Sequence, residues 1–192
     1  MNVPEHSLLK TAEFAQPSKV IDALGIQPGM IVADFGAGSG AYTLGIAKAL
    51  SNAGRVYAVD VQKDLLRRLH TEASHKKVDK MIEFIWGDLE AKNGSKIADH
   101  QADLVLVSNI LFQVPDKKAL LVEALRVVKP TGRIAVIEWS DSFNGMGPRR
   151  EDVVKPDECI AFAYAAGLSL TREFHAGAHH YGLFFNPAQR HL

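Results

Sequence analysis

The sequence is short of cysteine, of net charge and of long apolar runs, and each shortage argues against a class of protein. Its single cysteine, Cys159, cannot form an internal disulfide, and the surrounding run CIAFAYAA favours a small buried side chain over a nucleophile. Lys plus Arg and Asp plus Glu both number 22, so there is no overall basic field to recruit nucleic acid. No stretch approaches the ~18 apolar residues of a membrane span, and Met1–Lys10 lacks the apolar core of a secretory signal. We therefore expect a cytoplasmic protein with no membrane span and no nucleic-acid partner.

Short apolar runs alternate with helical patterns over the first two thirds of the chain. This alternation is typical of βαβ units, in which a parallel sheet is covered by helices on both faces. The runs are almost continuously apolar, as expected for strands buried on both sides. The predicted strands are Met30–Phe35, Arg55–Asp60, Met81–Trp86, Asp103–Ser108 and Arg133–Trp139.

Helix signals fill the intervals between these strands. Prolines and glycines mark the ends of the first and last helices, and apolar residues at helical spacing mark the others. The predicted helices are Pro17–Gly25, one starting at Ala41, one with the stripe Leu65, Leu66, Leu69 and Ala73, one with the stripe Leu120, Leu121, Ala124, Leu125 and Val128 that stops at Lys129–Gly132, and Pro156–Gly167.

The C-terminal part has a different pattern. Two strand-like runs, Leu168–Phe174 and His180–Phe185, are separated by an Ala-Gly-Ala-His stretch, which predicts an antiparallel hairpin. An ordinary dinucleotide-binding dehydrogenase would continue with parallel strands instead. The sequence therefore predicts a mostly parallel sheet that ends in a reversed strand.

The strongest local motif is the glycine-rich turn IVADFGAGSG at Ile31–Gly40, which runs from a strand directly into a helix. Without Cβ atoms, Gly36, Gly38 and Gly40 allow a tight turn that a flat polar ligand can approach closely. Gly36 and Gly38 with Ala41 also fit the dinucleotide pattern GxGxxG/A, so the glycines alone leave the ligand open.

Asp34, two residues before the first glycine, favours one of these ligands. A carboxylate there would repel a pyrophosphate, whereas S-adenosylmethionine offers an ammonium and a sulfonium. The alternative is that Asp34 only bonds amides of the loop.

Two more acids follow the next two strands. Asp60, followed by Val61, ends the second strand and can accept hydrogen bonds from both ribose hydroxyls of either cofactor. Asp88, within Gly87-Asp88-Leu89 after the third strand, can accept from the adenine amine. Since parallel strands end at one edge of the sheet, the three acids predict a shared site.

These motifs, in this order, resemble the class I S-adenosylmethionine-dependent methyltransferases over about Pro17–Pro187. Ser108–Gln113 is similar to that family's motif after the fourth strand, and Val128–Ile134 resembles the lead-in to its fifth strand. The resemblance implies a Rossmann-like three-layer α/β sandwich with a seven-stranded, mostly parallel sheet whose last strand is antiparallel. It also implies that S-adenosylmethionine, which leaves as S-adenosylhomocysteine, contacts Asp34, Gly36, Ala37, Gly38, Gly40, Tyr42, Asp60, Val61, Gly87, Asp88, Leu89, Ser108 and Asn109.

Within the family, the chain is similar to small enzymes related to the ubiquinone and menaquinone C-methyltransferases and to the arsenite methyltransferases. Arsenite enzymes bind arsenic with several cysteines, and this chain has only Cys159. The quinone enzymes usually carry a longer N-terminal lid than residues 1–29 here. We expect one domain over residues 1–192, with an N-terminal cap (1–29), a cofactor-binding core (30–139), and a lid loop, last helix and hairpin (140–192).

Candidate acceptor-side residues lie at the ends of the fourth and fifth strands and on the hairpin. The candidates for catalysis are Asn109, Gln113, Glu138 and His180, and further candidates at the mouth of the site are Trp139, Asp141 and Tyr181. His175, His179 and His180 invite a metal hypothesis, but no cysteine or acidic fourth ligand is close in sequence, so we predict no metal.

The leading hypothesis is a methyltransferase that acts, as a monomer or homodimer, on an unidentified small or medium-sized acceptor. One alternative is an NAD-dependent oxidoreductase, from the other interpretation of the glycines. The other is a non-catalytic regulatory module that binds S-adenosylmethionine.

Overall fold

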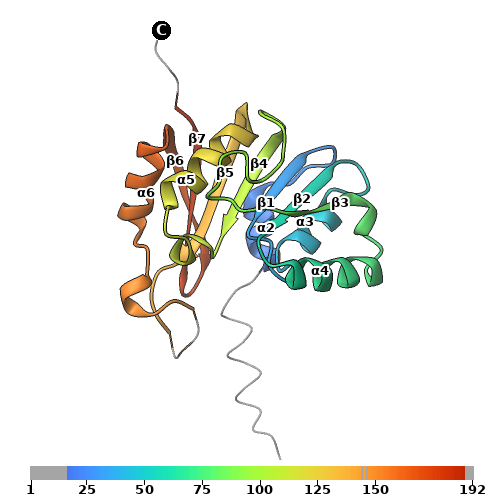
Figure 1. The fold of residues 1–192 in the computed structure, drawn as a ribbon, viewed down its shortest axis with the longest axis horizontal. Coiled ribbons are helices and arrows are strands. Elements are labelled where there is room, and N and C mark those ends of the chain that lie inside the picture. The colour runs from blue at the N-terminus through green and yellow to red at the C-terminus, as the bar shows by residue number, and fades with distance from the viewer. Residues whose placement is uncertain (1–16, 144, 146, 189–192) are drawn as a thin grey trace, which may run out of the picture.

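In a computed structural model, residues 17–143, 145 and 147–188 are described, and they form a seven-stranded sheet with helices on both faces (Figure 1). The strands are β1 (Ile31–Phe35), β2 (Arg55–Asp60), β3 (Ile82–Trp86), β4 (Ala102–Ser108), β5 (Val128–Trp139), β6 (Leu168–Gly177) and β7 (His180–Pro187). The α-helices are α2 (Pro17–Leu24), α3 (Thr43–Ala49), α4 (Lys63–His75), α5 (Lys117–Val127) and α6 (Pro156–Ala165), and short 3₁₀ turns are η1 (Asp79–Met81), η2 (Leu111–Gln113) and η3 (Arg150–Asp152).

The strand order across the sheet is β3-β2-β1-β4-β5-β7-β6. Neighbouring strands from β3 to β5 pair in parallel, whereas β7 is antiparallel to both β5 and β6. The predicted Rossmann-like sheet with a reversed C-terminal strand is thus confirmed. The order reverses between β1 and β4, and in sheets of this kind ligands bind beyond the carboxyl ends of the strands at that point.

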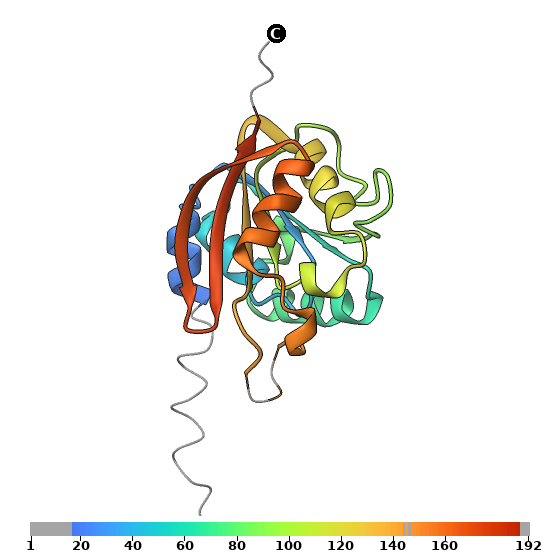
Figure 2. The ribbon, with the colours of Figure 1, turned by 90° about the vertical axis from the view of Figure 1, so that its left-hand side faces the viewer.

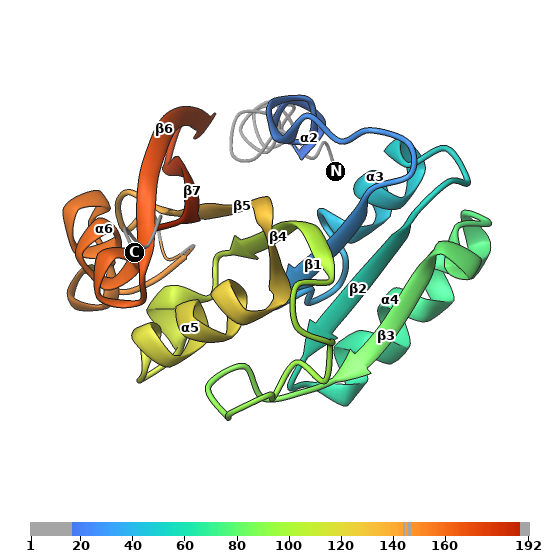
Figure 3. The ribbon, with the colours of Figure 1, turned by 90° about the horizontal axis from the view of Figure 1, so that it is seen from above.

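Two hydrophobic clusters form the core, one on each face of the sheet. The cluster on one face contains residues of α2, α3 and α4, and the cluster on the other contains residues of α5 and α6. Figure 3 shows α2 and α3 on one side of the sheet and α5 on the other. The β6–β7 hairpin, red in Figure 2, has α6 packed beside it.

The start of β5 differs from the prediction. Val128 was expected on the helix stripe and Lys129–Gly132 in a turn before a strand at Arg133, but β5 begins at Val128. Val128 pairs with Ala102 and is fully buried, and the next residue, Lys129, favours extended backbone because it precedes Pro130. The pairing then jumps to Arg133 with Leu104, so the intervening residues form an irregularity inside the strand.

Two other boundaries shift by a few residues. Helix α3 begins at Thr43 instead of Ala41. The hairpin loop is shorter than expected because β6 continues to Gly177, which pairs with His180. Ala176 is 2% exposed and joins the core, so this extension buries apolar surface.

Within the described part of the chain, every helix falls short of the length and apolar content that a bilayer crossing requires.

The crossover from β3 to β4, residues 87–101, contains turns and no helix. A buried polar cluster fastens it to α5. The Glu123 carboxylate accepts from the Ser95 hydroxyl at 2.5 Å and from Arg126 at 2.6 Å. Arg126 also donates to the carbonyl of Ile97 at 2.8 Å and pairs with Asp99. Although burial acts to raise the pKa of Glu123, its bonds to Arg126 and Ser95 hold that pKa below the ordinary value.

We predict that Glu123→Gln lowers the free energy of unfolding by about 2–3 kcal/mol, because it leaves the mostly buried Arg126 without its main counter-charge. Asp99→Asn, which removes a carboxylate that is 68% exposed, should cost less than about 1 kcal/mol. Urea unfolding of the two variants measures the difference, and equal losses would contradict this account.

Candidate functional site

A hollow of about 340 Å³ opens at the carboxyl ends of the strands on both sides of the β1–β4 reversal. We call it the carboxyl-edge hollow. It gathers residues that follow four different strands, as the sequence predicts. The predicted site residues that line it are Gly36, Gly38, Asp60, Val61, Gly87, Asp88, Leu89, Asn109 and Gln113.

The glycine-rich loop packs closely against the end of β2 and against the side chains of Ile110 and Leu69. The amides of Gly36 and Ala37 both donate to the carbonyl of Val59, at 2.9 and 3.0 Å. Gly36 has φ +76°, and a Cβ there would lie 2.7 Å from the side chain of Ile110. At Gly40, φ is +90° and a Cβ would lie 2.1 Å from Leu69. At both positions the positive φ strains any residue other than glycine, and a Cβ would also have to displace the end of the Ile110 or Leu69 side chain.

Asp60 ties this loop to the end of β2. One carboxylate oxygen accepts from the amide of Gly38 at 2.9 Å and the other from the amide of Gln62 at 2.7 Å. The side chain is 7% exposed and lines the hollow. Since each carboxylate oxygen has two acceptor positions, Asp60 retains capacity for ligand hydroxyls. Next to it, Val61 is 60% exposed and offers an apolar surface.

The segment after β3 is fixed by its own turn. The amide of Gly87 donates to the carbonyl of Asp60 at 3.1 Å, which brings the ends of β2 and β3 together. The exposed Asp88 accepts from the amide of Glu90 at 3.0 Å. Leu89 is 5% exposed and packs in the core while it also lines the hollow.

Asn109 is the most unusual residue of the site. It has φ +53°, an uncommon angle for a residue other than glycine. Its amide oxygen is buried and has no hydrogen-bond partner among the described residues. Its backbone is held on both sides, because its N–H donates to the carbonyl of Ile137 at 2.9 Å and its carbonyl accepts from Gln113 at 2.7 Å. The left-handed backbone angle and the unpaired buried oxygen, at the wall of a hollow, make Asn109 a candidate for a ligand contact.

The other predicted cofactor residues are not among those that line the hollow: Asp34, Ala37, Gly40, Tyr42 and Ser108. Asp34 is 2% exposed, and its carboxylate accepts from the Thr43 hydroxyl at 2.5 Å, a partner that the sequence did not suggest. Burial, opposed by the Thr43 bond and assisted by Asp60, raises the pKa of Asp34 to about 6. Burial likewise raises the pKa of Tyr42, against a side-chain hydrogen bond to Ser108.

Glu138 is fully buried at the end of β5. Its two oxygens accept from the amides of Leu111 and Trp139, both at 2.9 Å. Burial, opposed by these backbone bonds, raises its pKa to about 7. The contacts make Glu138 a positioning residue for the segment that follows β4, and a direct catalytic role stays a prediction.

The structure separates the three histidines. His175 is exposed on β6, and His179 in the hairpin loop bonds both oxygens of Asp141 at 2.9 Å. His180 is 7% exposed, and neither ring nitrogen has a partner among the described residues. Its ring lies 4.2 Å from that of Trp139, and burial lowers its pKa.

Tyr181, beside His180, donates its hydroxyl to the carbonyl of Val154 at 2.9 Å. Among the described residues, no group of three or more His, Cys, Asp or Glu is placed to hold a metal ion. The loop expected at the mouth, Ser140–Lys155, includes residues 144 and 146, which lie outside the described part, as do residues 1–16 of the expected cap.

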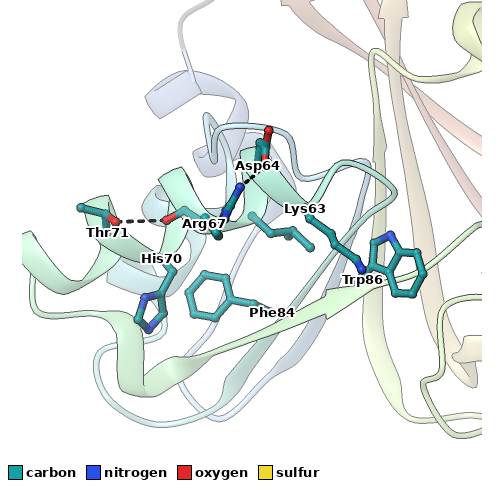
Figure 4. A pocket seen from close by; sticks show the side chains of 8 residues that line it. Lys63, Asp64, Arg67, His70, Thr71, Phe84 and Trp86 are labelled. Atoms are coloured by element: carbon teal, nitrogen blue, oxygen red, sulfur yellow. Dashed lines mark hydrogen bonds and ion pairs between the residues drawn. The ribbon is translucent and has the colours of Figure 1, made fainter.

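A larger hollow, of about 660 Å³, lies between α4 and β3 (Figure 4). Lys63 lies over the ring of Trp86, with its Nζ 3.9 Å from the ring centre, and His70 meets Phe84 edge to face. None of the predicted cofactor residues lines it. Choosing the cofactor site by the volume of the hollow alone would therefore have given a different place from the one that the sequence motifs predict.

The sequence reasoning missed some lining residues of the carboxyl-edge hollow. Three of them, Leu65, Ile110 and Val114, are apolar and suit the flat faces of a ring between them. Ile110 lies inside the predicted segment Ser108–Gln113, and Leu65 lies on the predicted helix stripe. The sequence positions of these two residues could therefore have indicated that they line the site. The missed residues are Gln62, Leu65, Glu90, Ile110 and Val114.

Comparisons with known proteins agree with this geometry. Residues 26–163 match the family model described as a methyltransferase domain. The ubiquinone/menaquinone biosynthesis C-methyltransferase of Hydrogenovibrio crunogenus is 31% identical over 120 residues, which are 62% of this chain and 46% of that protein. This chain thus spans about half the length of the curated relatives it matches.

Solved structures share the fold. A SAM-dependent methyltransferase from Aquifex aeolicus superposes with a TM-score of 0.81 and 24% identity, covering 96% of this chain and 98% of that one. An arsenic(III) S-adenosylmethionine methyltransferase from Chlamydomonas reinhardtii gives a TM-score of 0.67 and 21% identity, covering 86% of this chain and 65% of that one.

We predict that Asp34→Asn stabilises the ligand-free protein at pH 8 by about 1–3 kcal/mol, because each unit of raised pKa corresponds to about 1.4 kcal/mol of cost for the ionised form. The pKa of Asp34 is raised on folding, so the cost is complete above pH 6 and disappears as the pH falls toward the unfolded value. Urea unfolding at pH 8 and pH 4.5 tests this, with the exposed Asp157→Asn as the matched control. A gain that is the same at both pH values, or a loss at pH 8, would contradict the prediction.

Proposed function

The chain belongs to the Rossmann-like family of S-adenosylmethionine-dependent methyltransferases, and from this premise we propose that its carboxyl-edge hollow holds the adenosine part of S-adenosylmethionine. The bound cofactor would supply its methyl group to a small or medium-sized acceptor at the neighbouring ends of β4 and β5 and the start of β7. The observation that carries the proposal is Asp60, which holds the glycine loop and faces the hollow at once.

The residues of the hollow fit this cofactor in chemistry as well as in position. Asp60 has spare acceptor positions for ribose hydroxyls, and Asp88 can accept from the adenine amine. Leu65 and Ile110 provide apolar surface for the adenine ring. The unpaired oxygen of Asn109 requires a donor, and the cofactor's ammonium is one.

When bound, S-adenosylmethionine supplies a methyl group that its sulfonium has already made electrophilic. The protein therefore needs to align an acceptor with that carbon and exclude water. Glu138 contributes by fixing the segment after β4 against the end of β5. Asp34, ionised above pH 6, adds a negative charge behind the glycine loop, and we propose that it stabilises the cofactor's positive groups.

We propose that Trp139 and His180 form the acceptor side. Because its pKa is lowered, the imidazole of His180 is neutral near pH 7 and can accept a proton. Neither nitrogen is occupied by another described residue, so a hydroxyl of the acceptor can bond there. The indole of Trp139 beside it offers a flat surface.

A hydroxylated aromatic ring is the acceptor that this pair suits best. Curated relatives are named as C-methyltransferases of ubiquinone and menaquinone biosynthesis. For this chain, which spans about half their length, both the ring acceptor and methylation at carbon are proposals.

The organisation of the chain completes the proposal. We propose one domain, in which the cap (1–29), the core (30–139) and the C-terminal part (140–192) act together. The monomeric or homodimeric state, the absence of a nucleic-acid partner and the cytoplasmic location stay predictions from the sequence.

We expect calorimetric titration to give micromolar binding of S-adenosylmethionine and S-adenosylhomocysteine, and none of NADH. Asp60→Asn should weaken both by about 10–100-fold, because hydrogen bonds to a charged group contribute about 1.5–3 kcal/mol. Asp64→Asn, an exposed acid on α4, is the control. Binding of NADH alone would support the oxidoreductase alternative instead.

We expect His180→Asn to lower kcat on a hydroxylated aromatic acceptor by about 10²–10⁴-fold, the usual contribution of a general base. The affinity for S-adenosylhomocysteine should stay unchanged. In the unmodified enzyme, kcat should fall as the pH drops below the ordinary pKa of histidine, because protonation removes the base. His175→Asn, on exposed β6, is the control.

An unchanged kcat in His180→Asn would overturn the base assignment. Cofactor binding with no methyl transfer to any acceptor of a broad panel would favour the regulatory module.

A further inference from the structure

A hollow of about 510 Å³ lies at the amino edge of the sheet, at the opposite ends of the strands from the cofactor site. The starts of β1, β4 and β5 and the β6–β7 hairpin surround it. We call it the amino-edge hollow. The polar side chains that line it are Asp103, Thr131, Arg133, Thr171, Arg172 and Asn186.

Two irregularities of the sheet meet at this hollow. Between β4 and β5 the pairing jumps from Val128 to Arg133, which turns Thr131 toward the hollow. Between β6 and β7 the pairing skips Thr171, so that Thr171 and Arg172 both line the hollow, although adjacent residues of a regular strand point to opposite faces. Bulges that redirect side chains are frequent beside binding sites.

Two arginines in the hollow have no acidic partner. Neither Arg133 nor Arg172 forms an ion pair with a described residue. Both guanidinium groups lie over the ring of Phe184, at 5.4 and 4.8 Å from its centre. The ring packs against both groups and can hold them near each other.

The other contacts of these arginines leave donors free. Arg133 donates through one terminal nitrogen to the carbonyl of Leu24 at 2.5 Å, and Arg172 donates to Ala23 at 3.4 Å, so both reach the end of α2. The Nε of Arg133 is buried and has no partner among the described residues. Since each guanidinium has five N–H donors, most remain for a ligand.

Asp103, the one carboxylate among the described residues that line the hollow, is already neutralised. Asp103 bonds Lys129 at 2.6 Å through one oxygen and the amide of Ile31 at 2.8 Å through the other. Although burial acts to raise its pKa, these bonds hold the pKa of Asp103 below the ordinary value. The two arginines and Lys129 thus outweigh a single acid, and the hollow favours an anion.

We propose that the amino-edge hollow binds an anion whose carboxylate or phosphate oxygens bridge Arg133 and Arg172. Planar guanidinium groups match both oxygen groups with paired hydrogen bonds. The hydroxyl of Thr131 and the amide of Asn186 are further donors at the rim, whereas the Thr171 hydroxyl donates to the carbonyl of Phe184 at 3.0 Å. An anion held there would connect the β6–β7 hairpin to the end of α2. This place is at the amino edge of the sheet, opposite the carboxyl edge where methyl transfer is proposed.

The test is calorimetric titration of the full chain with inorganic pyrophosphate and with citrate, at constant ionic strength. We expect saturable binding of at least one of them, weakened about tenfold or more by Arg172→Met. Arg68→Met, which removes an exposed arginine of α4, should leave it unchanged. Binding of citrate alone would show that the hollow selects carboxylates, and binding of pyrophosphate alone would show that it selects phosphates.

Two further measurements separate loss of anion binding from a general disturbance of the fold. In ¹⁵N-labelled protein, the Nε–H signal of Arg133 should shift on binding, which reports contact without a substitution that could disturb α2. S-adenosylhomocysteine should bind Arg172→Met as it binds the unchanged chain, so the two sites fail separately. No binding at millimolar anion, no shift of the Arg133 signal, or equal weakening by Arg68→Met would overturn the proposal.

Discussion

The bond between the Asp60 carboxylate and the amide of Gly38 is the contact on which the rest of the site depends. It fastens the end of β2 to the loop that follows β1, and it does so at the point where the strand order turns back toward β4. The other oxygen fixes the start of α4 through Gln62. One side chain thus joins three elements, so this wall of the proposed cofactor site is shaped without a ligand.

The sequence was sufficient for the sheet, and it predicted that Asp60, Gly87 and Asp88 lie together at one edge of the sheet. Continuous apolar runs located the strands, because a strand buried on both faces leaves little choice of residue. Asp60, Gly87 and Asp88 were found because parallel strands end together at one edge. The start of β5 was not found, because Lys129–Gly132 has the composition of a turn, and only the pairing of Val128 with Ala102 draws that segment into the strand.

The individual contacts of the buried polar side chains were beyond the sequence. The Thr43 hydroxyl on Asp34, the amides of Leu111 and Trp139 on Glu138, and the unpaired nitrogens of His180 depend on packing that no local pattern encodes. Two of these groups carry a free-energy cost of ionisation because they are buried. Asp34 and Glu138 are carboxyls kept where ionisation is unfavourable, and such strained groups concentrate at functional sites.

The position of β7 between β5 and β6 also bears on how the protein is made. β6 leaves the ribosome before β7, yet among the described strands β7 is its one neighbour in the sheet. While the chain is being synthesised, β6 therefore has no strand to pair with, although α6, which precedes it, can already pack beside α5. The sheet is therefore completed last by β7, which must pair with β5 on one side and with β6 on the other. Until that step, β5 presents an open edge, and translation of the last strand is what closes it.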